Sequence, residues 1–444
     1  MINCDLIIIG AGPGGYETAV RAAENGLQVV IIEKQELGGT CLNAGCIPTK
    51  CLCRNAEVLD EVREAATYGI STGEIQFNLS AAIARKNEVV EKLKAGVGML
   101  LKTPGITLVQ GEARFVDAHT VSAGESYSAP HIIIATGSVT KYLPIEGAHS
   151  EKVITSSEML NLQELPQRLC IIGGGVIGLE FASIFNSFGS QVEVVEFCKE
   201  ILPNFDKDLA KRLRTSLKKK GINFHTGAAA KRIEGGTVYF EEKGKEASVE
   251  ADLILMAVGR AAHVKALNLD DLGIQYTPRG IVVDEHMQTN VPGIYAVGDV
   301  NGLCQLAHAA TFQGYTALDH ILQQDHGYVQ SLKIIPAAVF THPEAAMVGD
   351  TEEALTAKGK TYKTYKAFYR SNGKALAMNE EDGIVKVLVD EGSDEILGTH
   401  ILGAHASDLI HEISTMMRNH VPFHALRQAV HAHPSLSEIF LSLK

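Results

Sequence analysis

The sequence lacks several features that would assign it to common protein classes. Its longest run of basic residues is Lys218–Lys220, and its formal net charge is −12 over 444 residues, so a nucleic-acid backbone would be repelled. No apolar run approaches the length of a membrane span, and no charged leader with an apolar core precedes the first predicted strand. We therefore expect a protein of a bacterial cytoplasm, with neither nucleic acid nor membrane as a partner.

Cysteine is also sparse, which excludes a disulfide-built scaffold. The chain has eight cysteines, and a pair of cysteines in a reducing compartment is more often catalytic or metal-binding than structural. Cys41 and Cys46 stand five positions apart in GGTCLNAGCIPTK, a stretch predicted to form a glycine-rich loop. This spacing alone permits a structural disulfide, a metal site, a redox pair or coincidence. Zinc is disfavoured because neither paired CxxC nor Cys/His spacing is present.

An internal repeat organises the first part of the chain. Leu6–Ile9 is a short apolar strand, and it leads into a GxGxxG string at Gly10–Gly15 and a helix predicted to begin near Tyr16. Cys170–Ile172 repeats this layout, with a second GxGxxG string at Gly173–Gly178 and a second helix. Strand, glycine turn and helix in this order are typical of a dinucleotide-binding unit.

Each repeat continues to a second strand that ends in a carboxylate. Glu33 and Glu196 both lie 23 residues beyond the first glycine of their string. The glycines allow a tight turn and close approach of the backbone to a pyrophosphate, which the helix N-terminus attracts, while the carboxylate accepts hydrogen bonds from a ribose. The sequence therefore predicts two complete dinucleotide-binding sites.

The two halves of the repeat also end in the same pattern, but they differ in length. His131–Ser138 and Leu253–Arg260 are apolar strands followed by glycine, and the first half carries about forty extra residues, including a helical pattern at Leu79–Leu101. This position of the insertion places both cysteines near the reactive end of a bound dinucleotide. A further strand ends at Asp299, which is suited to binding a polyol, and a predicted helix follows it.

From Ile334 the pattern changes to alternating strands and then to an amphipathic helix. The apolar stripe of that helix is predicted to form core or a subunit interface, and it consists of Leu409, Ile410, Ile413, Met416 and Met417.

Taken together, the strings resemble those of the flavin-dependent pyridine nucleotide–disulfide oxidoreductases over essentially the whole chain. Among these enzymes the dihydrolipoamide dehydrogenases are the most similar. The matching strings occur in the same order, and they are GAGPGGY, GGTCLNAGCIPTK, IIGGGVIGLE, VPGIYAVGDV, THPE…VG and HAHPSLSE.

The resemblance implies an α/β fold with two Rossmann-like domains and a C-terminal α+β domain. It predicts an FAD-binding domain with the redox-active disulfide at 1–145 and an NAD-binding domain at 146–262. Residues 263–330 would form a central domain that completes the FAD site, and residues 334–444 a dimerisation domain.

The resemblance also implies which residues bind each cofactor. FAD would be held by Gly10, Gly12, Gly15, Glu33, Thr136, Gly137, Asp299 and Ala307. NAD would be held by Gly173, Gly175, Gly178, Glu196 and Gly259. A carboxylate at Glu196 favours NAD over NADP because it would repel a 2′-phosphate, although Lys199 nearby keeps NADP open.

The catalytic residues follow from the same resemblance. Cys46 would be the thiolate beside the flavin, and Cys41 would exchange with the substrate disulfide. Lys50 would pair near the flavin with Glu180.

A proton acceptor is also needed, and imidazole suits this task near neutral pH. The chain has 17 histidines, so chemistry alone does not select one. By resemblance, His433 is the base and Glu438 orients it, while His431 is structural. In the family this histidine comes from the other subunit, which implies a homodimer.

The implied reaction is oxidation of protein-bound dihydrolipoamide through a Cys41–Cys46 disulfide and FAD, with reduction of NAD⁺. The implied partner is a lipoyl-bearing acyltransferase or the H-protein of a 2-oxoacid dehydrogenase or glycine cleavage complex. Two alternatives stay open at this point: another disulfide reductase, similar to glutathione reductase, and a flavin redox sensor without turnover.

Overall fold

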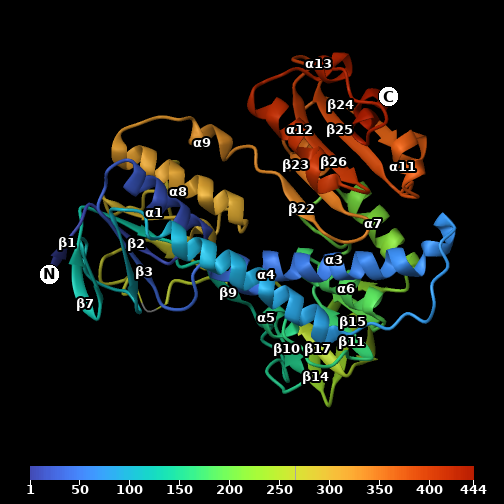
Figure 1. Cartoon of the computed structure of the whole chain (residues 1–444), viewed down its shortest axis with the longest axis horizontal. Coiled ribbons are helices and arrows are strands. Elements are labelled where there is room, and N and C mark those ends of the chain that lie inside the picture. The colour runs from blue at the N-terminus through green and yellow to red at the C-terminus, as the bar shows by residue number, and fades with distance from the viewer. Residues whose placement is uncertain (266) are drawn as a thin grey trace. The chain divides into compact units, whose positions relative to one another are not determined.

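The computed structural model, drawn in Figure 1, describes residues 1–265 and 267–444. Its contacts divide the chain into two compact units. The first unit comprises 1–51, 83–141 and 259–333, and the second comprises 52–82, 142–258 and 334–444. These units do not coincide with the four predicted segments. Residues 52–82 group with the second unit, and residues 259–262 group with the first.

The first unit is built on a five-stranded parallel sheet in the order β21-β8-β2-β3-β4. All four residues of β2 are buried, as a continuous apolar run requires in a strand covered on both faces. Helix α1 connects β2 to β3 and packs against α8. The elements wholly within this unit are β2 (Leu6–Ile9), α1 (Pro13–Glu24), β3 (Val29–Glu33), α2 (Gly39–Ala44), β4 (Ile106–Gln110), β8 (His131–Ile134), β21 (Ile294–Ala296), η2 (Gly298–Asn301) and α8 (Ala307–Leu322). Two helices belong to both units: α3 (Cys46–Arg63) passes into the second unit at residue 52, and α4 (Leu79–Leu100) passes into the first at residue 83.

Smaller elements complete the first unit. A four-stranded sheet has the order β1-β7-β6-β5, and β9 pairs with β18 in an antiparallel ribbon. They are β1 (Ile2–Asn3), β5 (Arg114–Asp117), β6 (Thr120–Ala123), β7 (Glu125–Ser128), β9 (Ser138–Thr140), β18 (Arg260–Ala262), β19 (Tyr276–Thr277), β20 (Gly280–Ile281) and α9 (Tyr328–Ser331).

The second unit repeats the first fold in its central part. Its parallel sheet has the order β10-β17-β11-β12-β13, and a three-stranded antiparallel sheet is appended to it. The elements are η1 (Ala65–Tyr68), β10 (Val153–Ile154), α5 (Ser156–Met159), β11 (Arg168–Ile172), α6 (Val176–Phe188), β12 (Gln191–Glu196), α7 (Lys207–Lys219), β13 (Asn223–Thr226), β14 (Ala228–Glu234), β15 (Thr237–Glu242), β16 (Lys245–Glu250) and β17 (Leu253–Met256).

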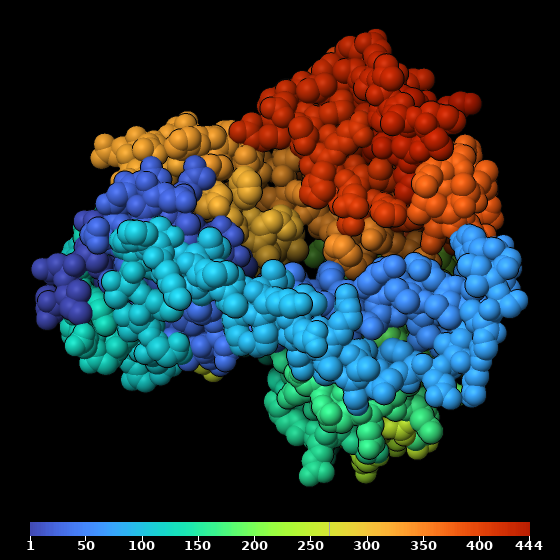
Figure 2. Space-filling view, in the orientation of Figure 1, coloured from blue at the N-terminus to red at the C-terminus, as the bar shows by residue number. Residues whose placement is uncertain are grey.

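The C-terminal part of the second unit, whose surface is orange and red in Figure 2, is a five-stranded antiparallel sheet with helices. Ile410 and Ile413 of α12 are buried in its core, which confirms the apolar stripe. The elements are β22 (Ala337–Val339), β23 (Ala345–Gly349), α10 (Glu352–Ala357), β24 (Tyr362–Phe368), η3 (Tyr369–Ser371), α11 (Gly373–Ala377), β25 (Ile384–Asp390), β26 (Ile396–Leu402), α12 (Ala406–Arg418), α13 (Phe423–Gln428) and η4 (Ser437–Ser442).

The first helix begins earlier than predicted. It starts at Pro13 rather than near Tyr16, because proline is preorganised for the first helical turn and needs no backbone donor there. Within the described ranges, none of the helices combines the length and apolar character of a membrane span.

Candidate active site

The two glycine strings have nearly the same backbone. Gly10 and Gly173 take φ values of 106° and 114°, a region that side chains rarely adopt. A β-carbon at Gly10 would clash with the carbonyl oxygen of Ala135, and one at Gly173 with that of Ala257. The fold itself therefore requires glycine at the first position of each string.

The middle glycines differ, because nothing in the protein requires them. A β-carbon at Gly12 would meet only the Cα of Gly39, at 3.9 Å, and one at Gly175 would have no neighbour within 4 Å. Both strings nevertheless hold glycine where the backbone enters a helix. A ligand that lies against the backbone explains this choice, so the residues present fit a dinucleotide pyrophosphate at both strings.

The two carboxylates are bound to their strings in the same way. Glu33 accepts hydrogen bonds from the backbone N–H of Ala11 and of Gln35, each at 2.7 Å. Glu196 accepts from the N–H of Gly174 at 2.5 Å and of Cys198 at 2.6 Å. Both carboxylates are buried, and each oxygen retains a lone pair for a ribose hydroxyl.

The cysteine stretch is not the loop that the sequence predicted. Cys41 lies within the short helix α2, and Cys46 is the first residue of α3. Gly45 separates the two helices with φ −148° and ψ −113°. The side chain of Asn43 donates to the carbonyls of Leu37 and Gly39 at 2.8 and 2.9 Å. These hydrogen bonds join the end of α2 to the residues at its start. Asn43 thus makes a compact turn where glycine content had indicated a loop.

The Cys41 thiol is held in its protonated form by its surroundings. A hydrogen bond to Cys46 and then burial raise the pKa of the Cys41 thiol, whereas the charge of Lys50 lowers it. The pair therefore does not ionise at both sulfurs together. Cys46 begins α3 and therefore lies at a helix N-terminus, where the partial positive charge favours anions.

Asp299 is held by two residues that the sequence analysis missed. The hydroxyl of Ser138 donates to the carboxylate of Asp299 at 2.5 Å. Arg260 donates to the Ser138 hydroxyl at 2.6 Å and to its carbonyl at 2.7 Å. Ser138 and Arg260 each follow the closing glycine of their half, Gly137 and Gly259, and this shared position could have indicated them.

Two buried amide side chains, those of Gln313 and Asn301, hold the turn that carries Asp299. The Gln313 carbonyl oxygen accepts from the backbone N–H of Gly298 at 2.7 Å and from the Asn301 side chain at 2.8 Å. Both amide side chains are buried. Of the other residues predicted for this site, Thr136 donates to the carbonyl of His263 at 2.8 Å, and Ala307 begins α8.

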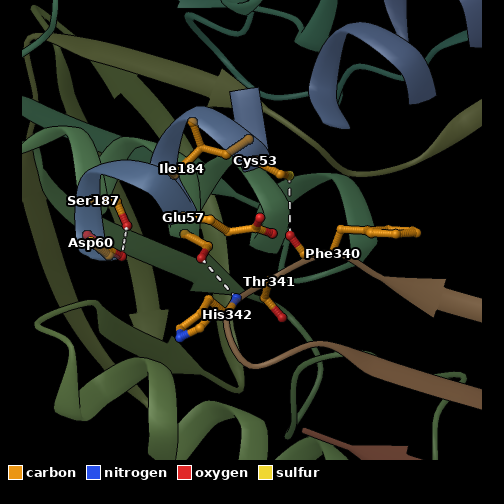
Figure 3. A pocket seen from close by; sticks show the side chains of 10 residues that line it. Cys53, Glu57, Asp60, Ile184, Ser187, Phe340, Thr341 and His342 are labelled. Carbon is orange, nitrogen blue, oxygen red and sulfur yellow. Dashed lines mark hydrogen bonds between the residues drawn. The ribbon is translucent and has the colours of Figure 1, made fainter. Parts of the chain in front are cut away.

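In the second unit, Glu180 lies buried on α6 and accepts from the backbone N–H of Phe340 at 3.0 Å. The nearby cavity has a volume of about 10 Å³ and is lined by Cys53, Asp60, Ser187 and His342 among others (Figure 3). This volume accommodates about one water molecule, so it is no site for a nucleotide. Lys50 belongs to the first unit, and its pairing with Glu180 stays a prediction.

The structure brings His433 and Glu438 together in the second unit. The Nδ1 atom of His433 lies 2.9 Å from Glu438 Oε1, and the other carboxylate oxygen accepts from the N–H of Ser435 at 2.7 Å. These hydrogen bonds, from Ser435 first and then from His433, lower the pKa of Glu438. The His433 side chain is 81% exposed, which leaves its second nitrogen open to a substrate.

His431 has a different environment from His433. Its ring is 8% exposed, and its Nε2 atom lies 2.9 Å from Glu412. Both ring nitrogens are engaged, since Nδ1 lies 3.1 Å from the carbonyl of Ala429. These contacts fit the structural role expected for His431.

Comparisons with known proteins show the family to which the chain belongs. Residues 4–314 match the pyridine nucleotide-disulphide oxidoreductase model, and residues 335–443 match the dimerisation domain of the same family. The chain belongs to the pyridine nucleotide-disulphide oxidoreductase family. It is 39% identical to the dihydrolipoyl dehydrogenase of Bacillus subtilis (strain 168) over 99% of this chain and 95% of the relative.

Two further proteins support the assignment. The dihydrolipoyl dehydrogenase of Chlamydia muridarum is 38% identical over 98% of this chain and 95% of its own length. Among solved structures, the HOCl-induced flavoprotein disulfide reductase RclA from Escherichia coli superimposes with a TM-score of 0.88. Its sequence is 31% identical, and the match covers 99% of each chain.

The family assignment confirms the predicted fold class and makes the chain an oxidoreductase that uses FAD and NAD. The segment after Ile334 is its dimerisation domain. Across residues 1–265 and 267–444, no three side chains of His, Cys, Asp or Glu gather in a geometry suited to a metal ion.

Gly175→Ala is expected to fold normally and to bind NAD poorly. The added carbon has no neighbour within 4 Å, and the backbone φ of −81° suits alanine. Overpacking against a ligand costs about 1–3 kcal/mol, so we expect the KM for NAD⁺ to rise about tenfold with an unchanged melting temperature. Gly73→Ala is the matched control, because Gly73 also has no neighbour within 4 Å. An unchanged KM in Gly175→Ala would show that no ligand lies against this glycine.

Proposed function

We propose that this oxidoreductase is an NAD⁺-dependent dihydrolipoyl dehydrogenase that oxidises protein-bound dihydrolipoamide. The observation that carries the proposal is the Cys41 and Cys46 pair, which shares a hydrogen bond at the N-terminus of α3, in the part of the chain that follows the first strand–helix–strand repeat. The relatives named dihydrolipoyl dehydrogenase support the choice of substrate.

The exchange begins with the enzyme's Cys41–Cys46 disulfide. One substrate thiol loses its proton to His433, and the thiolate attacks Cys41, so that the Cys41–Cys46 bond breaks and Cys46 leaves as a thiolate. The second substrate sulfur then attacks the mixed disulfide. This step releases lipoamide and the Cys41 thiol, and two electrons and two protons stay on the enzyme.

His433 and Glu438 manage the proton in this scheme. The hydrogen bond from Nδ1 to Glu438 holds the imidazole in one orientation and stabilises its protonated form. We assign His433 to the site of the partner subunit in a homodimer. Bound FAD would supply the redox chemistry that links the dithiol to NAD⁺.

The proposed cofactor residues are those of the two strings, their carboxylates and the further positions that the resemblance to the family implies. For FAD they are Gly10, Gly12, Gly15, Glu33, Thr136, Gly137, Asp299 and Ala307, and for NAD they are Gly173, Gly175, Gly178, Glu196 and Gly259. Lys50 and Glu180 are proposed to pair near the flavin. The proposed domains are 1–145 for FAD with the disulfide, 146–262 for NAD, 263–330 to complete the FAD site and 334–444 for dimerisation.

The proposed partner is a protein that carries a lipoyl group, either the acyltransferase of a 2-oxoacid dehydrogenase complex or the H-protein of glycine cleavage. The relatives named dihydrolipoyl dehydrogenase support this choice of partner. We propose the cytoplasm as its location, since thiols are kept reduced there.

Steady-state assays of the purified dimer test the proposal. Rapid reduction of NAD⁺ by dihydrolipoamide is the expected result. Preference for NADPH with glutathione disulfide would replace it with a glutathione reductase activity. FAD binding without turnover with any dithiol would instead indicate a redox sensor.

A further inference from the structure

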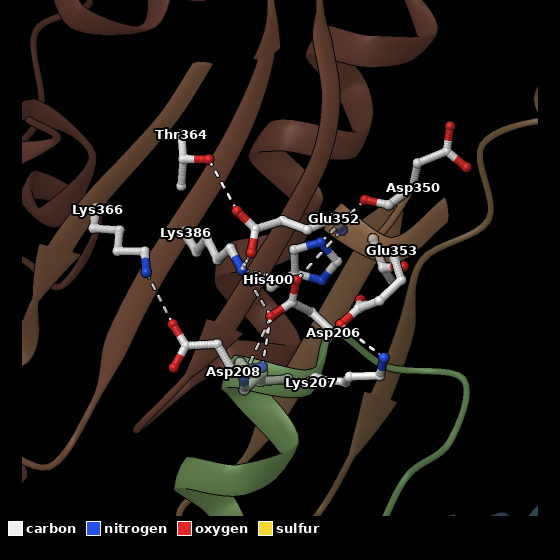
Figure 4. A network of polar contacts seen from close by, with 12 residues as sticks. Asp206, Lys207, Asp208, Asp350, Glu352, Glu353, Thr364, Lys366, Lys386 and His400 are labelled. Atoms are coloured by element: carbon white, nitrogen blue, oxygen red, sulfur yellow. Dashed lines mark hydrogen bonds and ion pairs between the residues drawn. The ribbon is translucent and has the colours of Figure 1, made fainter. Parts of the chain in front are cut away.

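A network of charged side chains, centred on a buried pair, lies where α7 meets the C-terminal sheet of the second unit (Figure 4). Lys386 of β25 donates to both carboxylate oxygens of Asp206 at 2.9 and 2.8 Å and to Glu352 at 2.5 Å. The side chains of Lys386 and Asp206 are 2% and 0% exposed. The network thus joins the NAD-binding part of the chain to the dimerisation domain.

The pair is ionised in spite of its burial. Burial alone would lower the pKa of Lys386, but its hydrogen bonds to Asp206 and Glu352 raise it. Burial alone would raise the pKa of Asp206, but the hydrogen bond from Lys386 and the nearby charges lower it. A buried ion pair is weak evidence for stability, because apolar residues often serve as well. Here the pair fixes the position of Asp206 relative to β25.

The carboxylate of Asp206 is the shared acceptor of these hydrogen bonds. Besides Lys386, its carboxylate accepts from the backbone N–H of Asp208 at 3.0 Å and of Leu209 at 3.4 Å, which caps the N-terminus of α7. The N–H of Glu352 also points to it, at 3.5 Å. One carboxylate therefore fixes the start of α7, the start of α10 and the centre of β25 relative to one another.

The segment before Asp206 leads directly to the second dinucleotide string. It begins after Glu196, and midway along it the N–H of Leu202 donates to the carbonyl of Gly174 at 2.9 Å. Leu202 is buried with φ 48°, a strained conformation for leucine. Glu200 is held by two hydrogen bonds from Arg214 of α7, at 2.6 and 2.8 Å. The hydrogen bond from Leu202 to Gly174 thus depends on the position of the segment 197–206. Lys386 holds the last residue of that segment, Asp206.

We propose that Lys386, a residue of the dimerisation domain, is a positioning residue for the NAD site. By holding Asp206, it keeps the segment 197–206 against Gly174 and keeps Glu196 in place for the ribose. The inference rests on the proposed function, because it assumes that NAD binds at this string.

The same junction supplies a matched control. Lys366 of β24 donates to Asp208 at 2.9 Å, so it also joins the C-terminal sheet to the start of α7. The Lys366 and Asp208 side chains are 37% and 31% exposed, and exposed ion pairs contribute little. Removing this pair changes the charge at the junction without releasing Asp206.

The test is Lys386→Met in the FAD-loaded dimer, compared with Lys366→Met. We expect Lys386→Met to raise the KM for NAD⁺ about tenfold, within the usual range of coupling between sites. The rate of anaerobic FAD reduction by dihydrolipoamide should not change, because that half-reaction needs no NAD. Lys366→Met should leave both quantities unchanged.

Asp206→Asn is a second variant that keeps the helix cap, since asparagine is also a good N-cap residue. It should raise the KM for NAD⁺ as well, and the double variant should be no worse than Lys386→Met, because both changes break one contact. An unchanged KM in either single variant, or an equal loss in both half-reactions, would overturn the inference. A failure of the proposed function would differ, since the unaltered enzyme would then not reduce NAD⁺ with dihydrolipoamide.

Discussion

Cys46→Ser is expected to lower NAD⁺ reduction by dihydrolipoamide about a thousandfold or more, as loss of a nucleophile does in other enzymes. Serine cannot form the disulfide through which electrons leave the substrate, and the same loss is expected for Cys41→Ser. The measurement is steady-state NADH formation by the purified dimer.

The matched control for this prediction is Cys53→Ser. Cys53 lies on the same helix, and its buried thiol contacts the carbonyl of Phe340 at 3.3 Å, a hydrogen bond that a hydroxyl can keep. Its activity should match the unaltered enzyme. NADH oxidation by an artificial acceptor bypasses the dithiol and should persist in all three variants. Substantial turnover of dihydrolipoamide by Cys46→Ser would refute the proposed exchange.

His433→Gln is expected to slow oxidation of dihydrolipoamide by about 10²–10⁴, the usual contribution of a general base. Glutamine can still hydrogen-bond to Glu438, but it cannot take the substrate proton. The loss should shrink as the pH rises toward the pKa of the substrate thiol, because the thiolate then forms without a base. A pH profile of kcat/KM measures both effects.

His424→Gln is the control for His433→Gln. His424 is also exposed, and its Nδ1 atom lies 2.7 Å from the carboxylate of Asp394, so it repeats the local arrangement without an assigned role. Its activity should stay unchanged. A His433→Gln enzyme with normal activity and a normal pH profile would remove this residue from the mechanism.

Mixed dimers test the proposal that His433 acts in the partner subunit. A dimer of one Cys46→Ser subunit and one His433→Gln subunit would have one intact site and one doubly altered site. When equal amounts of the two variants reassociate at random, about half of the dimers are mixed, and each mixed dimer has one intact site of two. About a quarter of full activity should therefore be restored, given a closed twofold dimer. No recovery would mean that cysteine and histidine act within one subunit.

The repeat could be predicted from the sequence because its physical requirements are local. Glycine at positions 10 and 173 is set by backbone conformation, and Glu33 and Glu196 each contact their own string. These constraints act over a few residues or over one strand–helix–strand unit, so they leave a regular spacing in the sequence.

The short helix around Cys41 could not be predicted, because its glycines indicated a loop. What decides it is the Asn43 side chain, which satisfies backbone carbonyls at the turn. Lys386 was missed for another reason. It lies in the apolar run of β25, and its partner Asp206 is 180 residues away in the chain. Nothing local marks a buried lysine whose counter-ion comes from another part of the fold.

The space beside Gly12 and Gly175 separates two kinds of selection. A library screened only for folded, protease-resistant protein should accept alanine at both positions, since the polypeptide leaves room for a methyl group. A library screened for growth that depends on the enzyme should reject it. Comparing the two outcomes position by position would map where bound nucleotides, rather than the polypeptide, restrict the sequence.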